Sequence, residues 1–491
     1  MKNSISTNLA DKQLLRNKAY INGCWVEANN KSTISVTNPA NGECIGCVPN
    51  MGKHEAAMAV DAAFLAFDEW RSLTAKNRSI ILMSWYYLII NNLNDIAKII
   101  TFEQGKPLKE ARDEVRYGAS FIEWFAEQGK RIYGEVIPTF DQNKRILTIK
   151  QPIGVVAAIT PWNFPIAMAT RKLAPALACG CTIVLKPSEE TPFTALALAE
   201  LAQRAGIPNG VLNVITGASI EIGEEITSNK KVRKVTFTGS TEVGKSIMSQ
   251  CSTSIKKISL ELGGNAPFII FDDADIDLAV AGAIASKFRN AGQTCICTNR
   301  FIVQDAIYDK FTRRLTHEVS TLKVGDGFTE GTDIGPLINE AAICKIEHLV
   351  ADAANKGARI VIGGKRHKKG GTFYEPTVIC DILPEMEIIH KEIFGPVATI
   401  MSFSTETDAL NIANDTCYGL AAYFYSRDIG RVWRVAEGLE YGMVGINEGL
   451  ISTEIAPFGG MKQSGIGREG SKDGINEYVE TKYLCMGGIY T

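Results

Sequence analysis

From residue 151 to residue 262 the chain alternates short apolar runs with amphipathic segments, and this alternation restricts the fold more than any other feature. Short apolar runs bounded by Gly, Pro or polar turns are typical of strands buried on both faces of a sheet. We expect strands at 154–159, 181–185, 211–215, 232–237 and 258–262, and helices at 170–179, 192–205 and after 241. Strands that alternate with helices in this way predict a parallel, doubly wound sheet.

A second alternation of the same kind follows residue 295. We expect strands at 301–303, 359–362, 421–425 and 443–446, and helices at 308–322, 408–414 and 431–438. No Pro/Ser-rich linker separates the two alternations, so the two domains should pack together and form a crevice where ligands bind. The predicted fold class is α/β, with two doubly wound parallel-sheet domains.

Two β-favouring segments fit neither domain: residues 129–151 and the tail at 464–491. Strand edges that stay exposed favour aggregation, so we expect these segments to pair with another subunit as a small β oligomerisation element. The expected assembly is a homo-oligomer, either a dimer or a tetramer. Residues 1–128 read as short strands followed by helices, which we interpret as scaffold.

Composition excludes several classes of function. The 491 residues are 45% hydrophobic, and 52 basic and 54 acidic residues give a net charge of −2. This balance predicts no nucleic-acid or membrane partner and favours a small-molecule substrate. The start of the chain has no apolar signal-peptide core, and the longest apolar patch, 80–90, is too short for a membrane span, so we expect a cytoplasmic protein with reduced thiols. The five His residues, none of which is spaced as a pair, predict no metal site.

Polar residues follow the predicted strands at the end where doubly wound sheets bind ligands. Thr160, Pro161, Trp162 and Asn163 come directly after the strand at 154–159. The Asn163 carboxamide could donate a hydrogen bond to a developing oxyanion without adding charge. A turn asparagine is the alternative interpretation.

Two further strand ends carry groups suited to a nucleotide. Lys186, Ser188 and Glu189 provide a cation and a carboxylate placed to bind ribose hydroxyls, although ordinary surface charge would give the same pattern. Gly239 and Ser240 open a strand-to-helix turn, and a helix N-terminus is suited to a phosphate.

Glu261 and Cys295 are the candidate reactive groups. In an apolar strand, burial would raise the pKa of Glu261 as a water-activating base requires; a structural Glu is the alternative. Cys295 follows Gly292 on a turn that ends a predicted helix at 275–288, where backbone amides could face a bound atom; an incidental buried thiol is the alternative. The GxGxxG at 465–470 follows a polar turn instead of a strand, so we do not interpret it as a dinucleotide site.

Seven motifs in a fixed order carry a family resemblance. They are PWNFP (161–165), KPSE (186–189), FTGSTEVG (237–244), ELGGNAP (261–267), GQTC (292–295), EIFGP (392–396) and PFGG (457–460). With these motifs the chain resembles the aldehyde dehydrogenase superfamily from about Ala19 to the C-terminus. The resemblance implies a cofactor-binding domain of residues 1–128 and 152–262, a catalytic domain of residues 263–463, and an oligomerisation element formed by the two remaining segments.

The resemblance also implies a mechanism. Cys295 is the nucleophile, Glu261 is the general base for deacylation, and Asn163 with the Cys295 amide forms the oxyanion hole. Hydride passes from the thiohemiacetal to NAD or NADP, and water hydrolyses the thioester to a carboxylate. The implied cofactor-binding residues are Thr160, Pro161, Trp162, Lys186, Ser188, Glu189, Gly239, Ser240, Leu262, Glu392 and Phe394.

Within the superfamily, the chain is most similar to the succinate-semialdehyde branch. The residues concerned are FRNAGQTCICTNR (288–300) and GLISTEIAPFGG (449–460). Arg171, Arg289 and Ser452 match that branch's site for the substrate carboxylate, and Phe458 matches an apolar wall. A carboxylate in a dry crevice needs a cationic partner, which Arg offers in bidentate form; pairing with structural acids is the alternative. Glutarate semialdehyde is the competing substrate, because one methylene changes binding by only about 1–3 kcal/mol.

The choice between NAD and NADP depends on Glu189. A carboxylate there would accept hydrogen bonds from both ribose hydroxyls and repel a 2′-phosphate, which favours NAD. Lys186 could offset some of this repulsion, so NADP stays open. Cys297 is a candidate redox switch, since a second thiol two residues from the nucleophile could form a reversible disulfide with Cys295; a small packing residue is the alternative.

Two other functions remain open from the sequence. A structural protein could retain this fold without activity, although the presence of Cys295, Glu261 and Asn163 argues against that interpretation. A thioesterase could use Cys295 and Glu261 without a cofactor. A nicotinamide absorbance assay separates both from a dehydrogenase.

Overall fold

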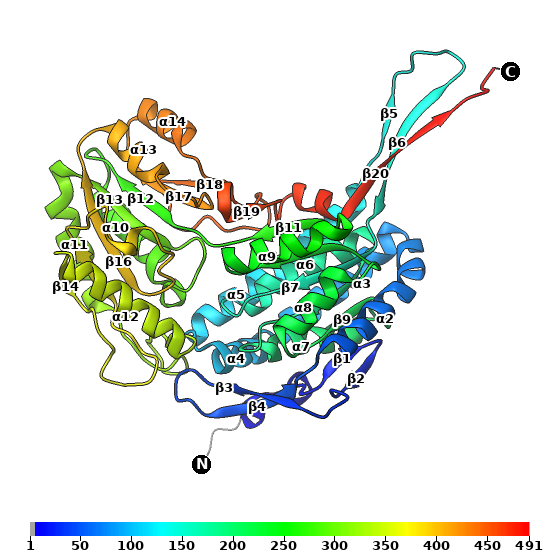
Figure 1. The fold of residues 1–491 in the computed structure, drawn as a ribbon, viewed down its shortest axis with the longest axis horizontal. Helices are drawn as coiled ribbons and strands as arrows, with labels where there is room; N and C mark the ends of the chain where they lie inside the picture. Colours follow the sequence, from blue (N-terminus) through cyan, green and yellow to red (C-terminus); the bar gives the residue numbers. More distant parts are fainter. Residues whose placement is uncertain (1–4, 491) are drawn as a thin grey trace.

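The computed structural model describes residues 5–490, which form two lobes and a projecting arm (Figure 1). The first lobe contains an eight-stranded sheet in the order β19-β11-β10-β7-β8-β9-β1-β2, whose five central strands are parallel. Its strands are β1 (Ala19–Ile21), β2 (Cys24–Val26), β7 (Val155–Ile159), β8 (Thr182–Lys186), β9 (Leu212–Val214), β10 (Val232–Thr238), β11 (Lys257–Glu261) and β19 (Gly465–Ile466).

Helices cover both faces of this sheet, because successive residues of the central strands point to opposite faces and the residues on each face are apolar. In β7, Val155 and Ala157 face one buried cluster, whereas Val156 and Ala158 face the other. The helices of this lobe are α1 (Ile5–Asn8), α2 (Lys53–Ser72), α3 (Ala75–Asn91), α4 (Leu93–Gln104), α5 (Leu108–Gln128), α6 (Pro165–Cys179), α7 (Pro192–Arg204), α8 (Ser219–Ser228) and α9 (Thr241–Cys251). A separate hairpin pairs β3 (Thr33–Thr37) with β4 (Cys44–Pro49).

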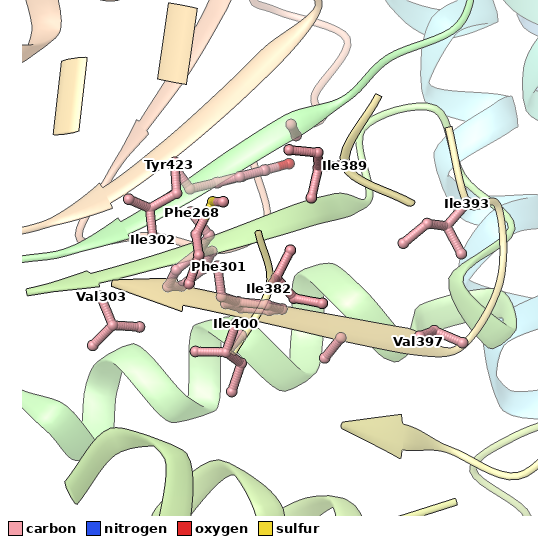
Figure 2. Packing of buried hydrophobic residues seen from close by; sticks show 14 of the residues in the cluster. Phe268, Phe301, Ile302, Val303, Ile382, Ile389, Ile393, Val397, Ile400 and Tyr423 are labelled. Atoms are coloured by element: carbon pink, nitrogen blue, oxygen red, sulfur yellow. The ribbon is translucent and has the colours of Figure 1, made fainter. Parts of the chain in front are cut away.

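The second lobe contains a seven-stranded sheet in the order β14-β15-β16-β13-β12-β17-β18, parallel except for β14. Its strands are β12 (Ala266–Ile270), β13 (Thr298–Gln304), β14 (Arg359–Ile362), β15 (Thr377–Cys380), β16 (Val397–Phe403), β17 (Ala421–Tyr425) and β18 (Met443–Ile446). Its helices are α10 (Ile276–Phe288), α11 (Tyr308–Thr321), α12 (Glu340–Asn355), α13 (Glu406–Asn414) and α14 (Ile429–Gly438). Figure 2 shows its apolar core, in which Phe268, Phe301 and Tyr423 lie near Ile302 and Ile400.

The arm is a three-stranded antiparallel sheet in which β6 (Arg145–Pro152) lies between β5 (Glu135–Ile137) and β20 (Val479–Met486). It extends away from both lobes and carries the C-terminus (Figure 1). The C-terminal segment is divided between two sheets, since β19 pairs with β11 in the first lobe before β20 enters the arm.

The predicted fold class is confirmed: two doubly wound parallel sheets and a small β element. Several elements were not expected from the sequence, among them β12, β15, β16, α5 and α12. Within residues 5–490, no helix combines the length and the apolar character needed to cross a bilayer.

Candidate active site

A cavity of about 370 Å³ lies between the two lobes at the carboxyl ends of the first lobe's strands. Three of the loops that form it follow β7, β10 and β11, and Cys295 and the segment at 392–394 come from the second lobe. Its lining includes Pro161, Trp162, Asn163, Gly239, Ser240, Leu262, Cys295, Glu392 and Phe394. The structure therefore brings together nine of the residues that the sequence proposed for catalysis and cofactor binding.

A second cavity of about 640 Å³ continues from the first across the end of the sheet. The two cavities share Pro161, Thr238 and Gly239. The second also contains Thr160, Lys186, Ser188 and Glu189, which were proposed from the sequence, together with Ser219 from α8. The two cavities form one elongated groove that ends beside Cys295.

The turn before Cys295 has unusual backbone geometry. After α10, Asn290, Ala291 and Gly292 adopt positive φ angles of 52°, 54° and 72°. Two of these residues are not glycine, so the turn is strained and depends on its surroundings. Gly292 is required by close packing as well, because a Cβ there would lie 2.2 Å from the carbonyl oxygen of Gly395.

Hydrogen bonds from other elements hold this turn. The Asn290 amide donates to Oε2 of Glu110 on α5 at 2.9 Å. The Gln293 side chain donates to the Asn290 carbonyl at 3.1 Å and accepts from the Ile338 amide at 2.9 Å. The position of Cys295 is thus fixed by both lobes.

The thiol of Cys295 is protonated at neutral pH in the free chain. Burial raises the pKa of Cys295 to about 12, while the guanidinium of Arg171 acts in the opposite direction and Glu261 adds to the increase. A neutral thiol must lose its proton before it can act as a nucleophile. A proton acceptor near the sulfur is therefore needed.

Asn163 follows β7 and lines the same cavity as Cys295. Its Nδ2 donates to the Gln293 carbonyl at 3.2 Å, and its Oδ1 accepts from the Phe164 amide at 3.1 Å. The backbone carbonyl of Asn163 accepts a hydrogen bond from the buried Nζ of Lys106 at 2.8 Å, and Lys106 also pairs with Glu114 at 2.5 Å. The carboxamide is thereby oriented with its N–H group on the cysteine side.

Glu261 ends β11 and is 4% exposed. Both of its carboxylate oxygens are buried without a hydrogen-bond partner in the described chain. Burial raises the pKa of Glu261 well above its usual range, and the nearby carboxylate of Glu469 raises it further. A carboxyl group in this state can take up a proton near neutral pH.

Glu469 belongs to a buried ion-pair group behind Glu261. It pairs with Lys172, and its Oε2 lies 3.1 Å from Nε of Arg171. Lys172 also donates to the Thr238 hydroxyl at 2.5 Å. Although burial opposes ionisation, Lys172 and Arg171 lower the pKa of Glu469, so this carboxylate is charged.

The residues proposed for the substrate carboxylate lie around α5 and α6. The Arg171 guanidinium lies 3.7 Å from the ring centre of Phe458, and that of Arg289 lies 5.3 Å from the ring centre of Phe164. Nη2 of Arg171 and Nε of Arg289 are buried without hydrogen-bond partners in residues 5–490. The alternative interpretation, in which both arginines pair with structural acids, thus accounts only for the Nε edge of Arg171, which faces Glu469. Ser452 is half-buried, and its hydroxyl lies beside Tyr117.

In the second cavity, Nζ of Lys186 lies 2.8 Å from Oε1 of Glu189 and 2.5 Å from the Ser219 hydroxyl. Ser219 also donates to Glu189. Although burial opposes ionisation, Lys186 and Ser219 lower the pKa of Glu189. Ser240 caps α9 by accepting from the Val243 amide at 3.3 Å.

Glu392 and Phe394 cover the other side of the groove. Oε1 of Glu392 accepts from the Gly264 amide at 3.0 Å, and burial raises the pKa of Glu392 to about 7. The Phe394 ring meets the Trp162 ring edge-on with 5.5 Å between centres.

The thiol of Cys297 is buried on the side away from the groove. Its Sγ donates to the carbonyls of Lys287 and Thr298, both at 3.5 Å. Cys295 and Cys297 are both free thiols in this structure. A reversible disulfide between them stays a prediction.

Sequence reasoning missed Lys106, Glu110, Glu114 and Glu469, which support the site from outside the motifs. One signal was available: Glu110 and Glu114 are four residues apart and therefore share a face of α5. The buried residues of this helix are mostly apolar. Two carboxylates on one of its faces therefore indicate that buried cations or N–H groups pair with them.

Comparisons with known proteins identify the family of this chain. The chain belongs to the aldehyde dehydrogenase family, because the model of that family matches residues 25–484. Over 98% of its length it is 59% identical to the succinate-semialdehyde dehydrogenase (NADP+) GabD of Escherichia coli K12, of which it covers 99%. It is 58% identical to a glutarate-semialdehyde dehydrogenase of Pseudomonas aeruginosa, covering 98% of this chain and all of that protein (100%). The crystal structure of succinate-semialdehyde dehydrogenase from Burkholderia pseudomallei matches with a TM-score of 0.97 at 59% identity, over 98% of this chain and 100% of that one.

Proposed function

We propose that this protein oxidises succinate semialdehyde to succinate with NAD or NADP. The observation that carries the substrate assignment is the pair of guanidinium groups of Arg171 and Arg289, which lie by Phe458 and Phe164 outside the linings of the two cavities. Nη2 of Arg171 and Nε of Arg289 are buried without partners within residues 5–490, and the charge of Arg171 acts on Cys295. Buried guanidinium nitrogens without hydrogen-bond partners are costly, so a substrate carboxylate between them would be bound strongly. The similarity to a succinate-semialdehyde dehydrogenase supports the same substrate.

The first half of the reaction is assigned to Cys295 and Asn163. The sulfur of Cys295 attacks the aldehyde carbon, and its proton passes to a nearby acceptor. Glu261 in its ionised form is the candidate acceptor, because burial gives its unpartnered carboxylate a high proton affinity. The Nδ2 group of Asn163 and the Cys295 amide then stabilise the negative charge on the former carbonyl oxygen, a contribution of about 3–4 kcal/mol for one such donor.

The second half is assigned to Glu261. After it has released the proton taken from Cys295 to solvent, Glu261 is a carboxylate again and removes a proton from water, which attacks the thioester carbon and displaces the Cys295 sulfur. The apolar surroundings of Glu261 favour this role, since a desolvated carboxylate is a stronger base than one in water. The Asn163 amide again faces the oxygen that gains charge.

The groove fits a nicotinamide dinucleotide. It is elongated, it narrows at Pro161, Thr238 and Gly239, and it ends at Cys295. NAD(P), when bound, supplies the hydride acceptor. Lys186 and Glu189 would hold the adenosine ribose, Ser240 at the α9 N-terminus would lie near the phosphates, and the remaining residues would line the path to the cysteine. These are Thr160, Pro161, Trp162, Ser188, Gly239, Leu262, Glu392 and Phe394.

Within this proposal we favour NAD over NADP. The carboxylate of Glu189 is charged and would repel a 2′-phosphate. Its ion pair with Lys186 reduces this repulsion, and the similar Escherichia coli enzyme is named for NADP. Measured kcat/KM values with both cofactors test this preference.

Glutarate semialdehyde is the second candidate substrate. A protein at 58% identity carries that name, and the extra methylene changes binding by only about 1–3 kcal/mol. The same arginine pair would bind either carboxylate. We further propose a homo-oligomeric assembly, a cytoplasmic setting and the domain boundaries expected from the sequence.

The substrate assignment predicts a selective effect of Arg289→Ala. We expect kcat/KM for succinate semialdehyde to fall at least 30-fold, which corresponds to about 2 kcal/mol or more for a lost charge-assisted contact, while uncharged butanal changes less than about threefold. Steady-state kinetics with succinate semialdehyde, glutarate semialdehyde and butanal, each with NAD and NADP, measure this. Arg313→Ala, at an exposed position on α11, is the matched control. An equal loss with charged and uncharged aldehydes would remove the carboxylate-binding role.

A further inference from the structure

Tyr117 is a half-buried residue of α5 that none of the catalytic assignments uses. Its hydroxyl is buried and makes no well-aligned hydrogen bond in residues 5–490, with the Ser452 side chain offering only a weak one. Its ring meets that of Phe121 edge-on, with 5.1 Å between the ring centres. A buried hydroxyl without a partner destabilises a protein, so such a group in a folded enzyme needs an explanation.

The surroundings of Tyr117 are cationic. The Phe121 ring that packs on Tyr117 also lies 5.4 Å from the Arg171 guanidinium, so the two side chains flank one aromatic ring. Ser452 lies beside the Tyr117 hydroxyl, and Arg289 acts on it electrostatically. The hydroxyl therefore faces the same space as the three residues proposed to bind the substrate carboxylate.

The groups already assigned to the substrate carboxylate leave room for one more donor. A carboxylate has two oxygens with about four lone-pair sites. Arg171 already directs its Nε toward Glu469, which leaves Nη2 as its unpartnered nitrogen within residues 5–490. Arg289 adds its Nε, which also lacks a partner there. With the Ser452 hydroxyl, the groups assigned to the anion come from three side chains, and a further neutral donor favours the transfer of a carboxylate from water into this buried site.

We infer that Tyr117 is a specificity-determining residue, whose hydroxyl donates a hydrogen bond to the remote carboxylate of the semialdehyde. This inference rests on the proposed function. It adds a neutral donor from α5 to the cationic donors from α6 and from the end of α10. The bound anion satisfies three groups that lack partners in the described part of the free protein.

A tyrosine suits this position better than another cation. A third buried cation beside Arg171 and Arg289 would repel both and would require further desolvation. Burial also raises the pKa of Tyr117, so the hydroxyl keeps its proton and stays a donor at physiological pH. The phenol provides a hydrogen bond without altering the charge of the site.

The experiment compares Tyr117→Phe with wild type on two aldehydes of equal length. For succinate semialdehyde we expect KM to rise about tenfold with kcat changed less than about twofold, because the contact is far from the reacting carbon. For butanal neither constant should change by more than about twofold. Tyr87→Phe, the same substitution at an exposed position on α3, is the matched control. The melting temperature should stay the same or rise, since the substitution removes an unpartnered polar atom.

Two outcomes would overturn the inference: an unchanged KM for succinate semialdehyde, or an equal loss with butanal. The failure of the proposed function looks different. If wild-type protein does not prefer succinate semialdehyde over butanal, the substrate assignment itself is wrong. If wild type shows that preference and Arg289→Ala removes it while Tyr117→Phe does not reduce it, then only the role of Tyr117 is wrong.

Discussion

Glu261 and Glu469 are two buried carboxyl groups whose pKa values are shifted in opposite directions. Glu469 is ionised because Lys172 and Arg171 pair with it, whereas Glu261 has no ion-pair or hydrogen-bond partner in the described chain. The charge of Glu469 raises the pKa of Glu261. One carboxylate thus holds two cations in place and raises the proton affinity of the other carboxyl group.

Glu392 predicts a pH dependence of cofactor binding. Its pKa is raised to about 7, so it is mainly neutral below pH 7 and mainly ionised above it. A carboxylate accepts hydrogen bonds from ribose hydroxyls more strongly than a neutral acid does. We therefore expect the KM for the cofactor to fall as the pH increases from 6 to 8, measured at saturating aldehyde.

Glu392→Gln is the control for this dependence. Its amide does not titrate, so the KM for the cofactor should be higher than in wild type above pH 7 and should not vary across this range. A variant with the same pH profile as wild type would show that another group titrates.

At the residue scale, the sequence predicted the functional side chains at strand ends but not the buried residues that hold them in place by hydrogen bonds and ion pairs. Asn163 and Cys295 follow recognisable elements, and the structure places both in one cavity. Glu469 contacts Lys172 from 297 positions away, and Glu110 contacts Asn290 from 180 positions away. Periodicity is a local signal, so it contains no information about such partners.

At the element scale, the turn between α10 and β13 is the least regular part of the catalytic centre. Its three positive φ angles are maintained by Glu110, by Gln293 and by the close approach of Gly395. Strain of this kind costs about 1–3 kcal/mol per residue and persists only where the surroundings enforce it. The strained turn places Cys295 at the groove, and the strain lowers the stability of the fold by that amount.

Gly292→Ala should therefore impair both stability and catalysis. The new Cβ would lie 2.2 Å from the Gly395 carbonyl oxygen, and the residue would keep a left-handed backbone. We expect a loss of more than about 2 kcal/mol in the free energy of unfolding and a fall in kcat of at least tenfold. Denaturant unfolding and steady-state kinetics measure these effects.

Gly357→Ala is a matched control, because Gly357 has a φ of 99° and a Cβ added there would meet no described atom within 4 Å. It should show only the backbone cost, about 1 kcal/mol, with normal kcat. Equal behaviour of the two variants would mean that packing against Gly395 is unimportant.

The missed elements have physical reasons. β12 contains Pro267, which argues against a central strand, and the structure accommodates it with a register shift between Ala266 and Pro267. α5 is rich in charged residues and contains Gly118, yet it is long and one of its faces is buried. The strands of the first sheet were predictable because they are continuous apolar runs with clear turns on either side.

At the scale of the whole molecule, the arm is the part least explained by a single copy of the chain. Its exposed apolar residues would be unfavourable in water, and a second subunit would cover them. They are Tyr133, Val136, Ile137, Phe140, Tyr483, Leu484 and Met486. This arrangement supports the proposed homo-oligomer.

Removal of residues 480–491 should lower the oligomeric state. The deletion takes away nearly all of β20 and leaves one edge of β6 unpaired. We expect a smaller assembly by sedimentation velocity, with the two lobes still folded by circular dichroism. Lys482→Ala, which keeps the strand, should preserve the wild-type assembly. An unchanged sedimentation coefficient after the deletion would exclude the arm from the interface.

The pairing of β6 with β20 has a consequence for biosynthesis. Pro152 pairs with Val479, so β6 leaves the ribosome about 330 residues, or tens of seconds, before its partner strand is made. During that interval a nascent chain exposes an open strand edge next to a lobe that already has most of its core. In the proposed homo-oligomer, recognition between subunits through the arm would wait until translation is nearly finished, which would limit premature association of chains on the same messenger RNA.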